Sequence, residues 1–270
     1  MGLREFFAGL FAKKHVRLGL ALGSGGAKGA AHVGVLKAFE EEGIKFDMVA
    51  GTSIGSIIGS FLAIGLDSED MIRMMKEYGI ADPVRFLGYK FKGYTVEQAM
   101  DVLLSEKTFA DTVIPFAAVA ADLNTGEEVV MKNGNLAKAV AASSAIPPVF
   151  KPVGRMNRKL VDGAFVNAVP ADVVKNMGAD VVISVNLTTI SSNVVGKATL
   201  DVMYKGHGVK EQNRLRQMKK YSDYVLTPDL AGFKSIDVTK TDDMFDRGYV
   251  CAKRNMYEIK KLLTSKKVKF

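Results

Sequence analysis

The sequence predicts an α/β fold in which a mostly parallel central sheet lies between two layers of helices. Two short apolar segments, residues 16–22 and 46–50, have the length of buried strands. Each is followed by a glycine-rich turn and then by apolar residues at helical spacing. Because parallel strands need a crossover connection, usually a helix, this alternation favours a single three-layer α/β/α domain.

The expected elements follow this pattern along the chain. Strand, glycine-rich loop, helix, strand, turn and helix are expected in that order at residues 16–22, 23–29, 32–39, 46–50, 51–55 and 57–64. Five further apolar runs have the length of short strands: 114–121, 128–131, 160–161, 181–185 and 224–226. Helical patterns are expected at 67–110, before 143–148 and from about residue 242 onward.

The domain organisation is expected to be simple. Residues 188–198 are polar and are expected to form a surface loop, but composition does not shift across them as it does at a domain boundary. We therefore expect one domain over residues 16–265, preceded by an N-terminal amphipathic segment at residues 1–15.

Composition supports a folded protein with a positively charged surface. Of the 270 residues, 48% are hydrophobic and 24% are charged, which excludes collagen-like and wholly disordered chains. A single cysteine, Cys251, excludes an intramolecular disulfide and a multi-cysteine zinc ribbon. The net charge of +8 indicates an anionic partner, and charge alone does not choose between nucleic acid and anionic lipid.

The N-terminal residues bear on localisation. No apolar run reaches the roughly 20 residues of a membrane-spanning helix, and residues 6–12 are too short for a signal-peptide core. The sequence therefore favours a cytoplasmic protein. Aromatic and aliphatic residues within 1–15 follow helical spacing and are flanked by Arg4, Lys13 and Lys14. This segment is expected either to pack on the domain or to contact the inner face of an anionic membrane.

Residues 51–55, Gly-Thr-Ser-Ile-Gly, fit the G-x-S-x-G pattern of a serine nucleophile. A sharp turn between the expected strand and helix would present Ser53 at the carboxyl end of the sheet, with small residues on either side. The positive end of the helix dipole would favour negative charge that develops there. The alternative is that Ser53 only caps the helix, a frequent role for serine.

Residues 23–29, Gly-Ser-Gly-Gly-Ala-Lys-Gly, follow a strand and open a helix, so several unhindered amides would meet at a positive dipole end. This arrangement predicts an anion site. A dinucleotide-binding turn is disfavoured because the second strand runs into residues 51–53 without the required acid. A phosphate-binding P-loop is disfavoured because Lys28 lies between Ala27 and Gly29 and not before serine or threonine.

A serine nucleophile also needs a base, and the chain has only three histidines. Only His207 follows an acid as a Ser-His-Asp arrangement would need, and its polar surroundings favour an exposed loop. His32 is expected to be a packed residue of the first helix. A carboxylate is therefore the favoured base, and Asp162 is the candidate because it follows a short apolar run and precedes Gly163. The alternative is an ordinary turn aspartate.

These motifs together resemble those of the patatin-like phospholipase family. The family is marked by a glycine-rich oxyanion loop, a G-x-S-x-G nucleophile and a D-G-A/G aspartate, which correspond in order to residues 23–29, 51–55 and 162–164. Similarity extends over roughly residues 16–262, and the further matching stretches are 30–36, 121–127, 143–150, Asn167 and Pro170.

The resemblance implies specific roles for these residues. Ser53 would be the nucleophile and Asp162 the base of a Ser-Asp dyad. The oxyanion hole would be formed by the backbone amides of Gly25, Gly26 and Ala27. The supporting motif residues would be Gly23, Lys28, Gly29, Gly51, Gly55 and Gly163.

The function implied is that of a serine acyl hydrolase that cleaves carboxylic esters of phospholipids, lysophospholipids or neutral glycerides. No metal ion or organic cofactor is implied. Two alternatives stay open: an acyltransferase that uses the same acyl-enzyme, and a non-catalytic module that binds a lipid or nucleotide through the glycine loop. The expected partners are a lipid ester substrate and an anionic membrane in peripheral contact, and no nucleic acid is expected.

Overall fold

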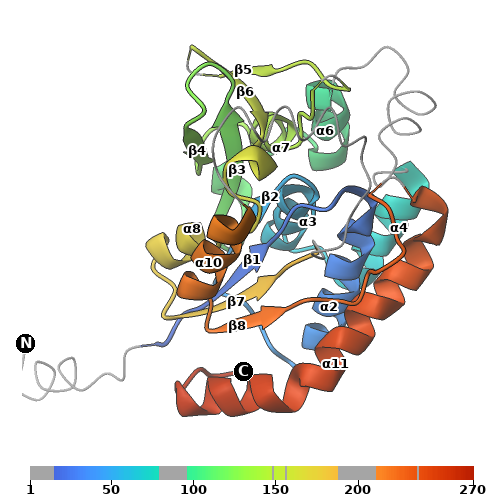
Figure 1. Cartoon of the computed structure of the whole chain (residues 1–270), viewed down its shortest axis with the longest axis vertical. Coiled ribbons are helices and arrows are strands. Elements are labelled where there is room, and N and C mark those ends of the chain that lie inside the picture. Colours follow the sequence, from blue (N-terminus) through green and yellow to red (C-terminus); the bar gives the residue numbers. More distant parts are fainter. Residues whose placement is uncertain (1–14, 79–95, 148, 156, 188–210, 236) are drawn as a thin grey trace, which may run out of the picture.

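The computed structural model describes residues 15–78, 96–147, 149–155, 157–187, 211–235 and 237–270 (Figure 1). Within these residues, eight strands form one sheet. They are β1 (Leu18–Leu22), β2 (Met48–Thr52), β3 (Phe116–Asp122), β4 (Glu128–Met131), β5 (Val153–Arg155), β6 (Arg158–Asp162), β7 (Val181–Val185) and β8 (Tyr224–Leu226). Their order is β5-β6-β3-β2-β1-β7-β8, and β4 pairs with β3 off this path.

The sheet has a parallel part and an antiparallel part. The neighbours among β3, β2, β1, β7 and β8 pair in parallel, whereas β4, β5 and β6 pair antiparallel with their neighbours. Every residue of β1, β2, β3 and β7 is buried, as expected for strands that helices cover on both faces.

Helices cover both faces of this sheet (Figure 1). Alternate residues of β1 point to opposite faces: Leu20 joins the core formed with α2 and α3, and Ala21 joins the core formed with α8 and α10. The predicted α/β fold with a central sheet flanked by helices is thereby confirmed. The helices are α2 (Ala30–Glu41), α3 (Ile54–Ala63), α4 (Ser68–Tyr78), α6 (Val96–Leu104), α7 (Leu136–Ser143), α8 (Ala171–Asn176), α10 (Glu211–Tyr221) and α11 (Thr241–Ser265).

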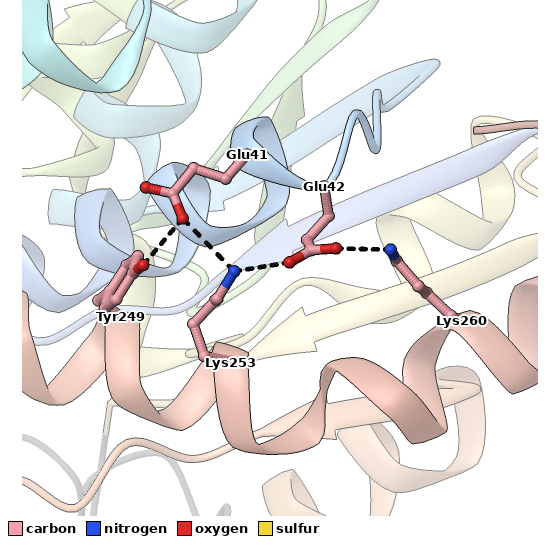
Figure 2. A network of polar contacts seen from close by, with 5 residues as sticks. All are labelled: Glu41, Glu42, Tyr249, Lys253 and Lys260. Carbon is pink, nitrogen blue, oxygen red and sulfur yellow. Dashed lines mark hydrogen bonds and ion pairs between the residues drawn. The ribbon is translucent and has the colours of Figure 1, made fainter.

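The long helix α11 packs closely against α2. A Cβ atom on Gly34 would lie 2.0 Å from the carbonyl oxygen of Phe245, and one on Gly248 would lie 2.0 Å from that of Ala31, so only glycine permits this approach. Farther along, Tyr249, Lys253 and Lys260 of α11 contact Glu41 and Glu42 at the end of α2, as Figure 2 shows. No helix in the described part of the chain, α11 included, is long and apolar enough to cross a membrane.

The observed helices and strands differ from the expected ones in where they begin and end, and three observed elements were not expected. β2 ends at Thr52, two residues later than expected, and α3 begins at Ile54 rather than at residue 57. The sequence pattern had not indicated α8, α10 or β5; α8 has six residues and β5 has three, too few to display a period. The expected elements over 79–95 and 188–198, and the N-terminal residues 1–14, lie outside the described residues.

Candidate active site

Ser53 alone forms the turn between β2 and α3. Its backbone has φ 56° and ψ −127°, a conformation that residues other than glycine rarely adopt. A Cβ atom on Gly51 would lie 2.1 Å from the carbonyl oxygen of Gly55, and one on Gly55 would lie 2.2 Å from that of Leu22. The two glycines of the motif are therefore required by the close packing of this turn. The Ser53 hydroxyl does not cap α3.

The strand β6 brings Asp162 to Ser53. β4 pairs with residues 118–121 of β3, which overlap the residues that pair with β2 and those that pair with β6, so β2 and β6 share the other edge of β3. Because β2 runs parallel and β6 antiparallel to β3, they approach each other from opposite directions. Thr52, the last residue of β2, pairs with Val119, and Asp162, the last residue of β6, pairs with the next residue, Ala120. The two strands thus end at one point of the sheet.

Ser53 and Asp162 are joined by a short hydrogen bond. The Oγ of Ser53 donates to Oδ2 of Asp162 over 2.5 Å, and the amide of Ala164 donates to Oδ1 over 2.8 Å. The two side chains are shielded from solvent, with residue exposures of 5% for Ser53 and 1% for Asp162. Burial raises the pKa of Asp162 to about 6, against the opposing effect of these two hydrogen bonds. The carboxyl group therefore becomes a stronger base than an ordinary aspartate.

Ser143, the last residue of α7, holds the backbone of Ser53. Its Oγ accepts a hydrogen bond from the amide of Ser53 at 3.0 Å and donates to the carbonyl oxygen of Val119 at 2.6 Å. This buried hydroxyl thus connects the turn to β3. Sequence reasoning assigned no role to Ser143, although the stretch 143–150 was among those that resemble the family.

The glycine loop begins at the end of β1, beside this turn. Gly23 and Ser24 donate their amides to the carbonyl oxygens of Val185 and Ala168, at 3.0 and 2.9 Å. Within the described residues, the amides of Gly25 and Gly26 have no hydrogen-bond partner, so both can donate to an anion. The amide of Ala27, expected to take part in the oxyanion hole, instead donates to the carbonyl oxygen of Ser235 at 2.8 Å.

The supporting residues of the motifs serve close packing. A Cβ atom on Gly29 would lie 2.1 Å from Cγ1 of Ile54, and one on Gly163 would lie 2.2 Å from the carbonyl oxygen of Val119. Lys28 is 3% exposed, and its burial lowers the pKa of the ammonium group while the nearby Asp237 opposes that shift. The close contact between Gly29 and Ile54 shows that the loop 23–29 and the turn 51–55 are packed against each other.

The histidines make other contacts. Nε2 of the buried His32 bonds to the carbonyl oxygen of Gly23 at 2.7 Å, and the exposed His15 bonds to Asp47. His207 lies outside the described residues. Among the residues described, no cluster of three or more histidine, cysteine, aspartate or glutamate side chains could hold a metal ion.

The fold and the site define an α/β protein with a strained serine after a parallel strand. This serine is hydrogen-bonded to a buried carboxylate and lies beside a loop with two amides that have no partner among the described residues. The model of the patatin-like phospholipase family matches residues 20–175. The chain belongs to this family.

Curated relatives agree with this assignment, and a solved structure shares the fold. Human patatin-like phospholipase domain-containing protein 6 is 30% identical over 86% of this chain, and the match covers 20% of that relative. Patatin-like phospholipase domain-containing protein ZK370.4 of Caenorhabditis elegans is 36% identical over 64% of this chain and 14% of its own length. The chain thus matches a fifth or less of the length of these two curated relatives. The crystal structure of VipD from Legionella pneumophila has the same fold, with a TM-score of 0.56, 15% identity, and coverage of 94% of this chain and 67% of that chain.

Proposed function

We propose that this protein is a serine acyl hydrolase that cleaves carboxylic esters of lipids. The 2.5 Å hydrogen bond from the Ser53 hydroxyl to Asp162 carries this proposal, because a nucleophilic serine needs a base within such a distance. The free amides of Gly25 and Gly26 support it by offering a site for an oxyanion. Membership of the patatin-like phospholipase family supports a lipid ester as the substrate.

In the acylation step, Oγ of Ser53 bonds to the carbonyl carbon of the ester while its proton passes to Asp162. The carbonyl oxygen becomes an oxyanion, which the amides of Gly25 and Gly26 stabilise. When this tetrahedral intermediate collapses, the bond from carbon to the alcohol oxygen breaks. The proton on Asp162 then passes to that oxygen, and the acyl group stays on Ser53.

In the deacylation step, water gives a proton to Asp162 and bonds to the acyl carbon, which forms a second oxyanion in the same place. Collapse of this intermediate breaks the bond to Oγ, and Asp162 returns its proton to Ser53. The fatty acid leaves, and the site is restored. A base with a pKa of about 6 is ionised near neutral pH and suits both proton transfers.

The proposal is tested with S53A and a matched control, S60A. Ser60 is another buried serine, and its hydroxyl donates to the carbonyl oxygen of Ile57 within α3. We expect the wild-type protein and S60A to react with a fluorophosphonate probe and to release fatty acid from mixed lipids, as measured by mass spectrometry. We expect S53A to do neither. Turnover of p-nitrophenyl esters by S53A would contradict the proposal.

The same product screen separates the alternatives. Transfer of the acyl group to an added lysolipid or alcohol, in place of fatty acid release, would identify an acyltransferase that uses the same acyl-enzyme. Absence of probe labelling in the folded wild-type protein would favour a non-catalytic binding module.

A further inference from the structure

We propose that His32 is a positioning residue, whose Nε2–H holds the carbonyl group of Gly23 and thereby fixes the glycine loop 23–29 against the turn that carries Ser53. This inference deepens the proposed function and rests on it, because the loop matters to catalysis only if its amides bind an oxyanion.

The geometry of His32 determines where its proton lies. His32 belongs to α2, is fully buried, and has its Nε2 2.7 Å from the carbonyl oxygen of Gly23. A carbonyl oxygen can only accept a hydrogen bond, so the proton is on Nε2. Burial lowers the pKa of His32 to about 4, so the ring is neutral near pH 7. Nδ1 then carries a lone pair and has no hydrogen-bond partner within the described residues.

The carbonyl group of Gly23 lies where the loop and the turn meet. A Cβ atom on Gly55 would come within 2.7 Å of this oxygen, so it lies against the turn 51–55. The amide of Gly23 donates to Val185, and its carbonyl accepts from His32, so both polar groups of this residue are held. The free amides of Gly25 and Gly26 follow two and three residues later, and their direction depends on this anchored peptide.

The unpartnered Nδ1 indicates why a histidine occupies this position. A buried polar atom without a partner is unfavourable, and an apolar side chain of similar size would avoid it. An apolar side chain would, however, leave the carbonyl oxygen of Gly23 without the donor that it has now. His32 therefore supplies a single hydrogen bond at the junction of the two catalytic segments.

The test compares H32L, which removes the donor, with H32Q, whose amide nitrogen can replace Nε2. Two measurements are made on each: kcat and KM for a soluble ester, and amide hydrogen exchange over residues 23–29. S60A serves as the control, because it changes a buried polar side chain whose hydrogen bond lies within its own helix. Should H32L not fold, H32M takes its place, because methionine adapts to irregular spaces in a core.

We expect H32L to lower kcat by about 10- to 100-fold, less than the roughly 10²- to 10³-fold loss when an oxyanion donor is removed outright. KM should stay within about twofold, because substrate binding is not changed. Exchange over residues 23–29 should rise. H32Q should recover kcat to within about threefold of wild type and restore slow exchange, and S60A should match wild type.

Two results would overturn the inference. One is that H32L keeps the kcat and the amide exchange over residues 23–29 of the wild-type protein. The other is an equal loss in H32L and H32Q together with equal loss of thermal stability, which would show that the ring only fills the core. If the wild-type protein itself neither hydrolyses esters nor reacts with the fluorophosphonate probe, the proposed function fails. The exchange of residues 23–29 then still decides whether His32 holds the loop.

Discussion

The backbone of Ser53 lies in a conformation that costs about 1–3 kcal/mol for a residue with a side chain. Such strain persists only where neighbouring contacts fix the backbone. Here the close packing of Gly51 and Gly55 and the hydrogen bond from the Ser53 amide to Ser143 fix it. The same backbone conformation directs the hydroxyl to Asp162.

This strain predicts that two inactive variants of Ser53 differ in free energy of unfolding. S53A keeps the strained backbone, whereas S53G adopts positive φ without a steric cost. We expect neither variant to hydrolyse esters, and we expect S53G to exceed S53A in free energy of unfolding by about 1 kcal/mol in urea titrations. Greater stability of S53A would show that Ser53 is not strained.

The raised pKa of Asp162 predicts the acidic limb of the pH-rate profile. Only the ionised carboxylate accepts the proton of Ser53, so kcat/KM should fall as pH drops through about 6. We expect D162N to abolish the activity at every pH, a larger loss than the roughly 10- to 100-fold one expected for H32L. An acidic limb near the ordinary aspartate pKa of about 4, measured with a soluble ester, would contradict the effect of burial.

The same group should make stability depend on pH. The pKa of Asp162 is higher in the folded chain, where it is about 6, so the folded state binds this proton more tightly than the unfolded state. The contribution of Asp162 to the free energy of unfolding therefore falls as pH rises from about 4 through about 6, by on the order of 3 kcal/mol. Urea titrations across this range should show that D162N loses this part of the dependence. An identical pH dependence of the free energy of unfolding in wild type and D162N would contradict this contribution of Asp162.

At the scale of elements, the site arises where two strands end head to head. The sequence placed Ser53 on a turn after a strand and Asp162 at a strand end, and the structure has both there. It could not show that β6 runs antiparallel along the same edge of β3 as β2, because the pairing of short strands is not encoded in local periodicity. That pairing is what brings the two side chains together.

Contacts between distant segments could not be predicted from the sequence for the same reason. Ser143 is one serine at the end of an alanine-rich helix, and only the packing of α7 against β3 brings its hydroxyl to the amide of Ser53. Likewise, the amide of Ala27 looked as available as its neighbours, but the segment before α11 supplies Ser235 as its acceptor. Both cases depend on tertiary packing, which a motif of a few residues does not contain.

The packing of β1 against α3 gives a prediction at this scale. In G55A the new methyl group would lie 2.2 Å from the carbonyl oxygen of Leu22, so backbone must move apart. We expect G55A to lower the free energy of unfolding by about 1–3 kcal/mol, the usual cost of overpacking, and to abolish ester hydrolysis. G154A is the matched control, because no atom of the described residues lies within 4 Å of a Cβ atom on Gly154. Urea titrations that show equal stability for G55A and G154A would contradict this packing argument.

At the scale of the whole molecule, the site lies at the carboxyl ends of the parallel strands. The glycine loop follows the carboxyl end of β1, Ser53 follows that of β2, and Leu187, which contacts the position of Gly25, follows that of β7. Ligands of parallel α/β sheets bind beyond the carboxyl ends of the strands. A substrate that is part of a membrane must therefore reach these strand ends, and the net charge of +8 would attract the protein to anionic lipid.

The N-terminal residues are our candidate for this membrane contact, although residues 1–14 lie outside the described part of the chain. Leu3, Phe6, Phe7, Leu10 and Phe11 follow helical spacing, so a helix here would gather apolar side chains on one face with basic residues beside it. Such a segment would place the protein on anionic bilayers without taking part in the proposed reaction itself.

We therefore expect deletion of residues 2–12 to weaken binding to anionic liposomes in sedimentation assays and to slow hydrolysis of vesicle lipid, while turnover of a soluble short-chain ester is unchanged. A full-length variant with K13Q and K14Q serves as the control for charge: it should lose part of the anionic binding, because each basic residue near the surface contributes about 1 kcal/mol. Neutral vesicles should bind both variants poorly. Equal losses on vesicle lipid and soluble ester would instead mean that the segment packs on the domain, and unchanged liposome binding would dismiss the membrane role, because the apolar face would then have no lipid partner.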